Sequence, residues 1–158
     1  MKSNPDSAPF IKKLSLTDVP GVIAAYDACS PELKEMMMGA WPLTALLGKI
    51  HLALSTTPLK FLLLFRIKGC VAWSNGEIAG MAYIINKWYK HEKILGVFIC
   101  DKFQHKGIGT RLLSRILEGE DVVELNVREE NLAAIRMYKK KGFLQKNTIH
   151  HMEYNAKK

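Results

Sequence analysis

The pattern of apolar and polar positions predicts a mostly helical first part of the chain. Residues 10–16 alternate loosely between apolar and polar side chains, which favours a strand. After this strand, Ser, Thr, Asp and Pro stand at positions where helices begin, and apolar residues follow at helical spacing. These signals predict helices over residues 19–29, 31–38 and 42–54.

The segment 59–67 is rich in Leu and contains one β-branched residue, so it favours a helix over a strand, with Gly69 as its end. Its apolar face is wide for so short an element. We expect this face to pack on the sheet, and the alternative is a subunit contact in a homodimer.

From residue 70 onward the pattern becomes that of strands. Residues 71–74 and 78–85 flank Asn75-Gly76, a pair typical of the tight turn of a β-hairpin. Further strands are predicted over residues 94–100, 122–127 and 148–154. The second of these three is almost entirely apolar, and we expect it at the centre of the sheet.

Two more helices are predicted in this second part, over residues 110–117 and 132–141. Gly142 directly follows the second helix, where a left-handed residue commonly ends a helix. Strands and helices together predict a single α/β domain over residues 10–158, preceded by a flexible tail at residues 1–9.

A short basic loop joins the strand at 94–100 to the helix at 110–117. Its residues are Gln104, His105, Lys106, Gly107, Ile108, Gly109 and Thr110. Glycines let a backbone turn tightly and approach a ligand closely. The first turn of the following helix offers unpaired N–H groups and the positive end of the helix dipole. This order of elements predicts a site for a phosphate or pyrophosphate.

Two better-known phosphate loops do not fit this spacing. A P-loop has its lysine after the second glycine, whereas Lys106 precedes Gly107. A dinucleotide fingerprint has three glycines in the first βαβ unit, whereas this loop has two and lies two-thirds of the way along the chain.

The spacing Gln104-x-x-Gly107-x-Gly109 resembles the Q/R-x-x-G-x-G/A signature of the GCN5-related N-acetyltransferases, the GNAT family. Downstream, an apolar stretch at 125–127 and the N-x-x-A-x-x-x-Y pattern of residues 131–138, followed by Gly-Phe, resemble the second half of that family. The resemblance covers residues 70–153 well and the first 69 residues only loosely.

This resemblance implies a fold and an activity. The fold is a mixed, mostly antiparallel central sheet flanked by helices and splayed at a cofactor cleft. The activity is transfer of the acetyl group from acetyl-CoA to a primary amine, by direct attack in a ternary complex. The acceptor stays open between a small-molecule amine and a protein N-terminus or lysine. The alternatives are a non-catalytic acyl-CoA-binding module and, on charge alone, a basic nucleic-acid-binding domain.

The resemblance also implies roles for individual residues. The backbone of Val97, Phe98 and Ile99 would pair with the pantetheine amides of the cofactor, as an added strand would. The loop from Gln104 to Thr110 would bind the pyrophosphate. Asn131 would contact the cofactor, although Asn is also a good helix N-cap. Tyr138 would protonate the leaving thiolate as a general acid.

No general base is evident. Asn126 and Lys93 stand at two positions where relatives carry a glutamate. Other candidates are Glu92, Glu124, His51, His91, His150 and His151. Each of them is better explained as a surface or structural residue, and an amine can lose its proton to water without a dedicated base.

Composition adds limits. The formal net charge of +8 suits a polyanionic ligand such as coenzyme A, but the lysines are scattered and fit a solvated surface equally well. The longest apolar run, residues 61–65, is too short to cross a bilayer. The three cysteines form no metal-ligand spacing, so we expect free thiols, no metal and a cytoplasmic location.

Overall fold

The structure is a computed structural model, and it describes residues 9–37, 67–87 and 92–148. The predicted helix at 42–54 and most of the Leu-rich segment 59–67 lie outside these residues, as do the flexible tail and nearly all of the predicted last strand. Within the described residues, no helix is long and apolar enough to span a membrane.

In the described part of the chain, four antiparallel strands form the sheet, in the order β1-β2-β3-β4. They are β1 (Phe10–Lys13), β2 (Ile67–Ser74), β3 (Glu77–Lys87) and β4 (Glu92–Ile99). The turn between β2 and β3 has Asn75 at φ 53° and Gly76 at φ 80°. Two consecutive left-handed residues are what a tight hairpin turn requires, so the predicted hairpin is confirmed.

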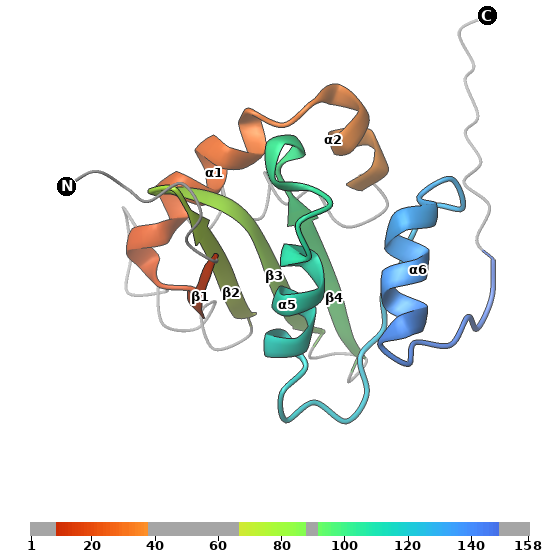
Figure 1. The fold of residues 1–158 in the computed structure, drawn as a ribbon. Helices are drawn as coiled ribbons and strands as arrows, with labels where there is room; N and C mark the ends of the chain where they lie inside the picture. The colour runs from red at the N-terminus through yellow and green to blue at the C-terminus, as the bar shows by residue number, and fades with distance from the viewer. Residues whose placement is uncertain (1–8, 38–66, 88–91, 149–158) are drawn as a thin grey trace, which may run out of the picture.

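Helices cover both faces of the sheet (Figure 1). On β4, the Phe98 ring packs edge-on against Tyr26 of helix α1 (Val19–Asp27), with ring centroids 5.9 Å apart. The next residue, Ile99, lies against Gly109 of helix α5 (Ile108–Ile116). Because neighbouring residues of a strand point to opposite faces, α1 and α5 lie on opposite faces.

The first two predicted helices are confirmed. A short 3-10 helix, Leu16–Asp18, leads into α1, and its Asp18 carboxylate accepts hydrogen bonds from Ser15 and pairs with Lys12 at 2.8 Å. Helix α2 (Pro31–Met37) begins where the Ser30 hydroxyl accepts a hydrogen bond from the backbone N–H of Leu33.

The predicted second pair of helices is confirmed as well. Helix α5 begins two residues earlier than expected, at Ile108. Helix α6 (Leu132–Lys140) is followed by Gly142 at φ 91°, the left-handed conformation that ends many helices.

The prediction that Gly69 ends a helix was wrong. Strand β2 begins at Ile67, and Gly69 lies inside it, opposite Tyr83 of β3. A Cβ atom on Gly69 would stand 2.8 Å from Cδ2 of Leu14. The glycine is therefore explained by the Leu14 side chain that packs on it, and not by a chain reversal.

The prediction of a central strand over 122–127 was also wrong. This segment makes only an isolated parallel bridge between Glu124 and Ile94 at the outer edge of β4. The Leu95 N–H donates to the Glu124 carbonyl, and the Glu124 N–H donates to the Lys93 carbonyl, both at 2.8 Å. On both sides of this bridge the segment is unpaired with β4, and Val122 and Val127 are 68% and 38% exposed. An apolar run normally marks a buried strand, but here it marks the splayed edge of the sheet.

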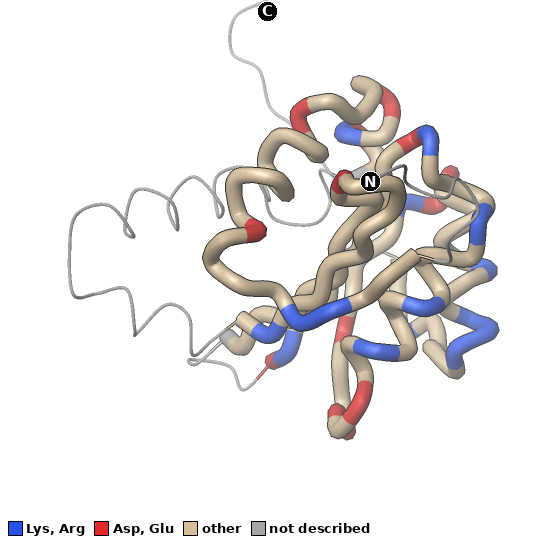
Figure 2. Tube along the Cα trace, turned by 60° about the vertical axis from the view of Figure 1, so that its left-hand side comes forward, with Lys and Arg blue, Asp and Glu red and all other residues tan. Residues whose placement is uncertain are grey.

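Lysines and arginines lie on several elements and alternate with acidic residues (Figure 2). Many of them pair locally, as Lys102 does with Glu77 and Arg115 does with Glu118. This distribution agrees with a solvated basic surface.

Candidate active site

The loop between β4 and α5 adopts the backbone geometry of an anion site. After β4, the short 3-10 helix Asp101–Phe103 turns the chain, and the Gln104 amide donates to the Ile99 carbonyl at 3.4 Å. His105 has φ 59° and Gly107 has φ 73°, both left-handed. Successive backbone N–H groups in a turn of this kind can form a concave site for an anion.

The start of α5 leaves its first N–H groups unused by the helix. Arg111 is the first residue whose N–H bonds back, to the Gly107 carbonyl at 3.2 Å. The N–H groups of Ile108, Gly109 and Thr110 therefore have no partner within the helix. Gly107 is the N-cap and has no side chain to accept from them. These donors, together with the helix dipole, suit a phosphate.

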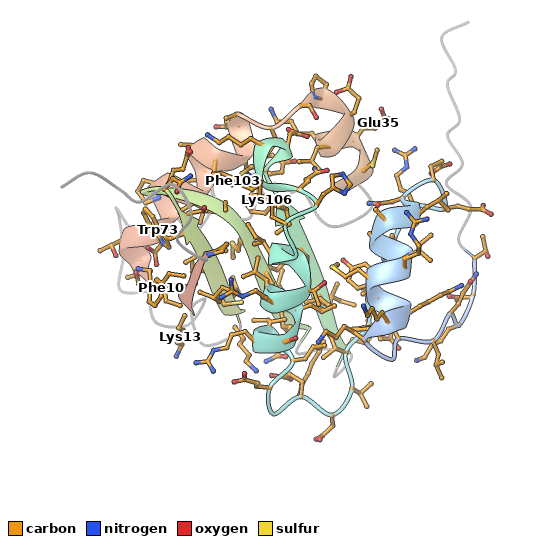
Figure 3. The ribbon with its side chains drawn as sticks, viewed as in Figure 1. Phe10, Lys13, Glu35, Trp73, Phe103 and Lys106 are labelled. Atoms are coloured by element: carbon orange, nitrogen blue, oxygen red, sulfur yellow. The ribbon has the colours of Figure 1, made fainter. Side chains whose placement is uncertain are left out.

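Two lysines stand beside this loop. Both ammonium groups lie over the ring of buried Phe103, Lys102 at 5.2 Å and Lys106 at 5.4 Å from its centroid. Figure 3 shows Phe103 and Lys106 above the N-terminal end of α5. The ring thus holds Lys106 next to the free N–H groups, where a cation adds to the attraction for an anion.

The two positions in the loop require glycine for different physical reasons. Gly107 needs its left-handed φ, and a Cβ there would meet nothing within 4 Å. Gly109 is helical, but a Cβ there would lie 3.0 Å from Sδ of Met137 and 3.6 Å from Cγ1 of Ile99. Gly109 therefore allows α6 to approach the end of β4, which the spacing of the glycines alone did not reveal.

The outer edge of β4 is open next to this loop. The Cys100 N–H bonds to Ala79 of β3, and the Leu95 N–H points the other way, to Glu124. Because backbone groups alternate along a strand, the N–H and C=O groups of Val97 and Ile99 face the outer edge, and those of Phe98 face β3. Within the described residues, no strand pairs with this edge beyond Ile94.

Tyr138 lies on α6, the helix whose Met137 side chain packs against Gly109. It is 9% exposed, and its ring packs edge-on against Phe143 with centroids 5.6 Å apart. Burial, and to a smaller extent the nearby Tyr83, raise the pKa of Tyr138 to about 12. The phenol is therefore protonated at neutral pH and can donate a proton.

Asn131 caps helix α6. Its side-chain oxygen accepts a hydrogen bond from the Ala134 N–H at 3.1 Å. The structural role foreseen for this residue is thus present, and the bond leaves the amide nitrogen of the side chain available.

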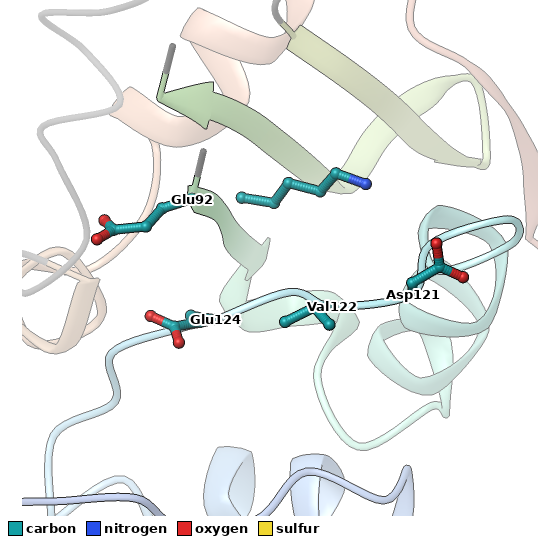
Figure 4. A pocket seen from close by; sticks show the side chains of 5 residues that line it. Glu92, Asp121, Val122 and Glu124 are labelled. Carbon is teal, nitrogen blue, oxygen red and sulfur yellow. The ribbon is translucent and has the colours of Figure 1, made fainter. Parts of the chain in front are cut away.

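The candidate bases from the sequence gather around the start of β4. Glu92, Lys93, Asp121, Val122 and Glu124 line a pocket of about 200 Å³ (Figure 4). The Lys93 amine donates to Glu120 at 2.8 Å, which raises the Lys93 pKa and keeps the amine charged.

The other candidate bases add little. Lys146 pairs with Glu124 at 2.6 Å. Asn126 is exposed, and the four candidate histidines lie outside the described part of the chain. Among the described residues, no three His, Cys, Asp or Glu side chains form a metal site.

Sequence reasoning missed two residues, Tyr83 and Gly96, that contact each other across β3 and β4. Tyr83 of β3 lies directly opposite Gly96 of β4 and is close enough to Tyr138 to influence its pKa. No motif marks either residue, because their proximity follows from the register between two strands. Only the register between β3 and β4 could have paired these two residues.

The chain is similar in sequence to an acetyltransferase family and to an uncharacterized N-acetyltransferase. The model of the acetyltransferase (GNAT) family matches residues 40–143. An uncharacterized N-acetyltransferase from Methanocaldococcus jannaschii is 38% identical over 86 residues, which covers 48% of this chain and 38% of that protein. The chain thus spans well under half the length of this relative.

Solved structures share the fold. AAC(6′)-Iy in complex with the bisubstrate analogue CoA-S-monomethyl-acetylneamine has a TM-score of 0.63 at 14% identity, over 95% of this chain and 100% of that one. A GNAT-family acetyltransferase from Streptococcus pneumoniae has a TM-score of 0.63 at 18% identity, over 96% of this chain and 93% of that one. A ribosomal-protein-alanine N-acetyltransferase from Brucella melitensis has a TM-score of 0.61 at 21% identity, over 84% of this chain and 83% of that one.

These structures confirm the predicted mixed α/β fold with its antiparallel sheet and flanking helices. The match over residues 40–143 includes the edge of β4, the loop before α5 and Tyr138. The chain therefore belongs to the GNAT family of acetyltransferases.

Proposed function

We propose that this protein is an N-acetyltransferase that binds acetyl-CoA and passes its acetyl group to a primary amine within a ternary complex. One observation carries the proposal: the open outer edge of β4 runs directly into the unpaired N-terminus of α5. An extended chain of amides that ends in a pyrophosphate matches both parts. The bisubstrate analogue bound by AAC(6′)-Iy contains CoA, which supports this assignment.

The cofactor would bind in the following way. The pyrophosphate lies on the N–H groups from Gln104 to Thr110, with Lys106 and His105 beside it. The pantetheine amides pair with the outward N–H and C=O groups of Val97 and Ile99. Phe98 contributes packing instead of backbone hydrogen bonds, because its N–H and C=O groups face β3 and its side chain is buried against Tyr26. Asn131 lies at the start of α6, where its free amide nitrogen can reach the cofactor.

Tyr138 is the proposed general acid. Attack of a neutral amine on the thioester carbonyl forms the amide bond and expels a thiolate, which takes up a proton. Tyr138 holds such a proton at neutral pH, as any phenol does, and burial raises its pKa further, to about 12. The amine loses its own proton to water in this scheme, since Lys93 is committed to Glu120 and Asn126 carries no acidic proton. The acceptor is a small-molecule amine or a protein amine.

A non-catalytic acyl-CoA-binding module is the second candidate, and the amine Lys93, where relatives carry a glutamate, favours it. The protonated phenol of Tyr138 favours the enzyme.

The three buried free cysteines support a reducing, cytoplasmic setting. The single domain over residues 10–158 and the homodimer remain predictions, and nucleic acid is the least favoured partner.

The test is calorimetric titration with acetyl-CoA, CoA and a DNA duplex, followed by a screen of amines and peptides with thiol release as readout. Gly107→Asp and Gly107→Asn form a matched pair, because both side chains tolerate the left-handed conformation and differ by one negative charge. We expect Gly107→Asp to bind CoA at least about tenfold more weakly than Gly107→Asn. Equal affinities would refute the pyrophosphate site, and binding without any turnover would favour the non-catalytic module.

A further inference from the structure

The ring of Tyr83 lies flat across β4. Tyr83 and Gly96 are direct partners in the antiparallel pair. A Cβ on Gly96 would stand 2.3 Å from Cζ of Tyr83, 2.4 Å from its hydroxyl oxygen and 2.6 Å from Cε1. The space where a side chain of β4 would stand is therefore filled by a side chain of β3. The hydroxyl end of that ring stands over Gly96.

The outer edge closes just beyond this point. Glu124 pairs with Leu95 and Lys93, so the segment after α5 meets β4 at Ile94. The pantetheine arm of the cofactor would enter from the α5 end and follow Ile99 and Val97. It cannot continue along the edge past Leu95, because Glu124 is paired there. Its acyl end must therefore stop beside Gly96 and turn toward one face of the sheet.

The two faces differ at this position. The side chains of Leu95 and Val97 stand on the face covered by α5, because they alternate with Gly96. On the face of α1, Gly96 contributes no side chain, and the Tyr83 ring occupies that space. Tyr83 is only 4% exposed. A rigid ring at the end of the arm leaves little room on this face.

We propose that Tyr83, seated over Gly96, is a specificity-determining residue that limits the acyl group to acetyl. The inference rests on the proposed function, since it assumes that the arm of the cofactor follows the edge of β4. A short acyl group ends against the ring. Each added methylene of a longer acyl group meets the ring and gains no burial there.

The experiment measures binding, so it needs no acceptor. Dissociation constants for CoA, acetyl-CoA and butyryl-CoA are determined by calorimetry for the parent and for Tyr83→Leu. We expect the parent to bind butyryl-CoA several-fold more weakly than acetyl-CoA. In Tyr83→Leu the ratio should shift toward butyryl-CoA by roughly tenfold, because two methylenes then become buried. Tyr83→Phe keeps the ring and should keep the parent's ratio.

Tyr26→Leu is the matched control. It truncates a second buried tyrosine on the same face, whose ring contacts Phe98 and not Gly96, so it should leave the ratio unchanged. If Tyr83→Leu does not fold, Tyr83→Met tests the same ratio with a flexible side chain of closer volume. Equal affinity of the parent for butyryl-CoA and acetyl-CoA, or an unchanged ratio in the folded variant, would overturn the inference about Tyr83 and leave the proposed function standing. A parent that binds none of the three ligands overturns the proposed function instead.

Discussion

Gly96→Ala tests the close packing between β3 and β4 without any ligand. The added methyl group would stand 2.3 Å from Cζ of Tyr83, well inside van der Waals contact. The Tyr83 ring is buried and rigid, so it must turn away or the strands must separate. Overpacking of this kind costs about 1–3 kcal/mol. Alanine in a strand regains about 0.5–1 kcal/mol of backbone entropy relative to glycine. We therefore expect a net loss of about 1–2 kcal/mol.

A double-mutant cycle combines Gly96→Ala with a second change, Tyr83→Leu. This second change removes the atoms that the new methyl group would meet, at its own cost of about 2–4 kcal/mol for the lost burial and the cavity. In the double variant the methyl group enters the vacated space. The double variant should therefore be no less stable than Tyr83→Leu alone, which corresponds to a coupling free energy of about 1–2 kcal/mol.

Urea denaturation of the four proteins gives the coupling from their free energies of unfolding, provided that the slopes agree. Gly80→Ala is the control. Its Cβ would stand 2.4 Å from the backbone carbonyl oxygen of Phe98, which truncation of Tyr83 cannot move. Tyr83→Leu should leave the cost of Gly80→Ala unchanged. Additive effects of Gly96→Ala and Tyr83→Leu, within about 0.5 kcal/mol, would refute the packing described here.

Three further predictions follow from other contacts. Tyr138→Phe should lower turnover by roughly 10²-fold and leave acetyl-CoA affinity unchanged, and parental turnover would show that the phenol is structural. Burial raises the pKa of Asp18, but hydrogen bonds from Lys12 and Ser15 lower it more and leave it below 3.8. Its stabilisation is thus present at neutral pH and lost as the pH falls through this lowered pKa, so acid unfolding of Asp18→Asn should depend less on pH. Burial raises the pKa of Cys29 to about 12, so a thiol reagent at pH 8 should find three thiols only after denaturation.

Sequence patterns predicted the local elements well. Ser30 before Pro31 marked the start of α2, and Asn75-Gly76 marked the turn between β2 and β3. Cap residues and turn residues act within a few positions of the chain, so their physical effect can be read from neighbours alone. The two glycines of the anion loop and the helix after it were found for the same reason.

Long-range packing decided what the sequence could not. The apolar segment 122–127 looked like a central strand, but its place in the sheet depends on how far it pairs with β4, and it pairs only at Glu124. Gly69 looked like the end of a helix, but it lies in β2 to admit the Leu14 side chain. Such outcomes follow from partners distant in the chain, which no local pattern contains.

The candidate site divides along the same line. The sequence by itself determined the glycine-containing loop before α5, the N-cap Asn131 and the position of Tyr138 on its helix, because each belongs to a motif of consecutive residues. Only the tertiary structure decided that Gly109 admits Met137 and that Tyr83 covers Gly96. The register between β3 and β4 and the approach of α6 to β4 set these contacts, and both depend on the packing of the whole sheet.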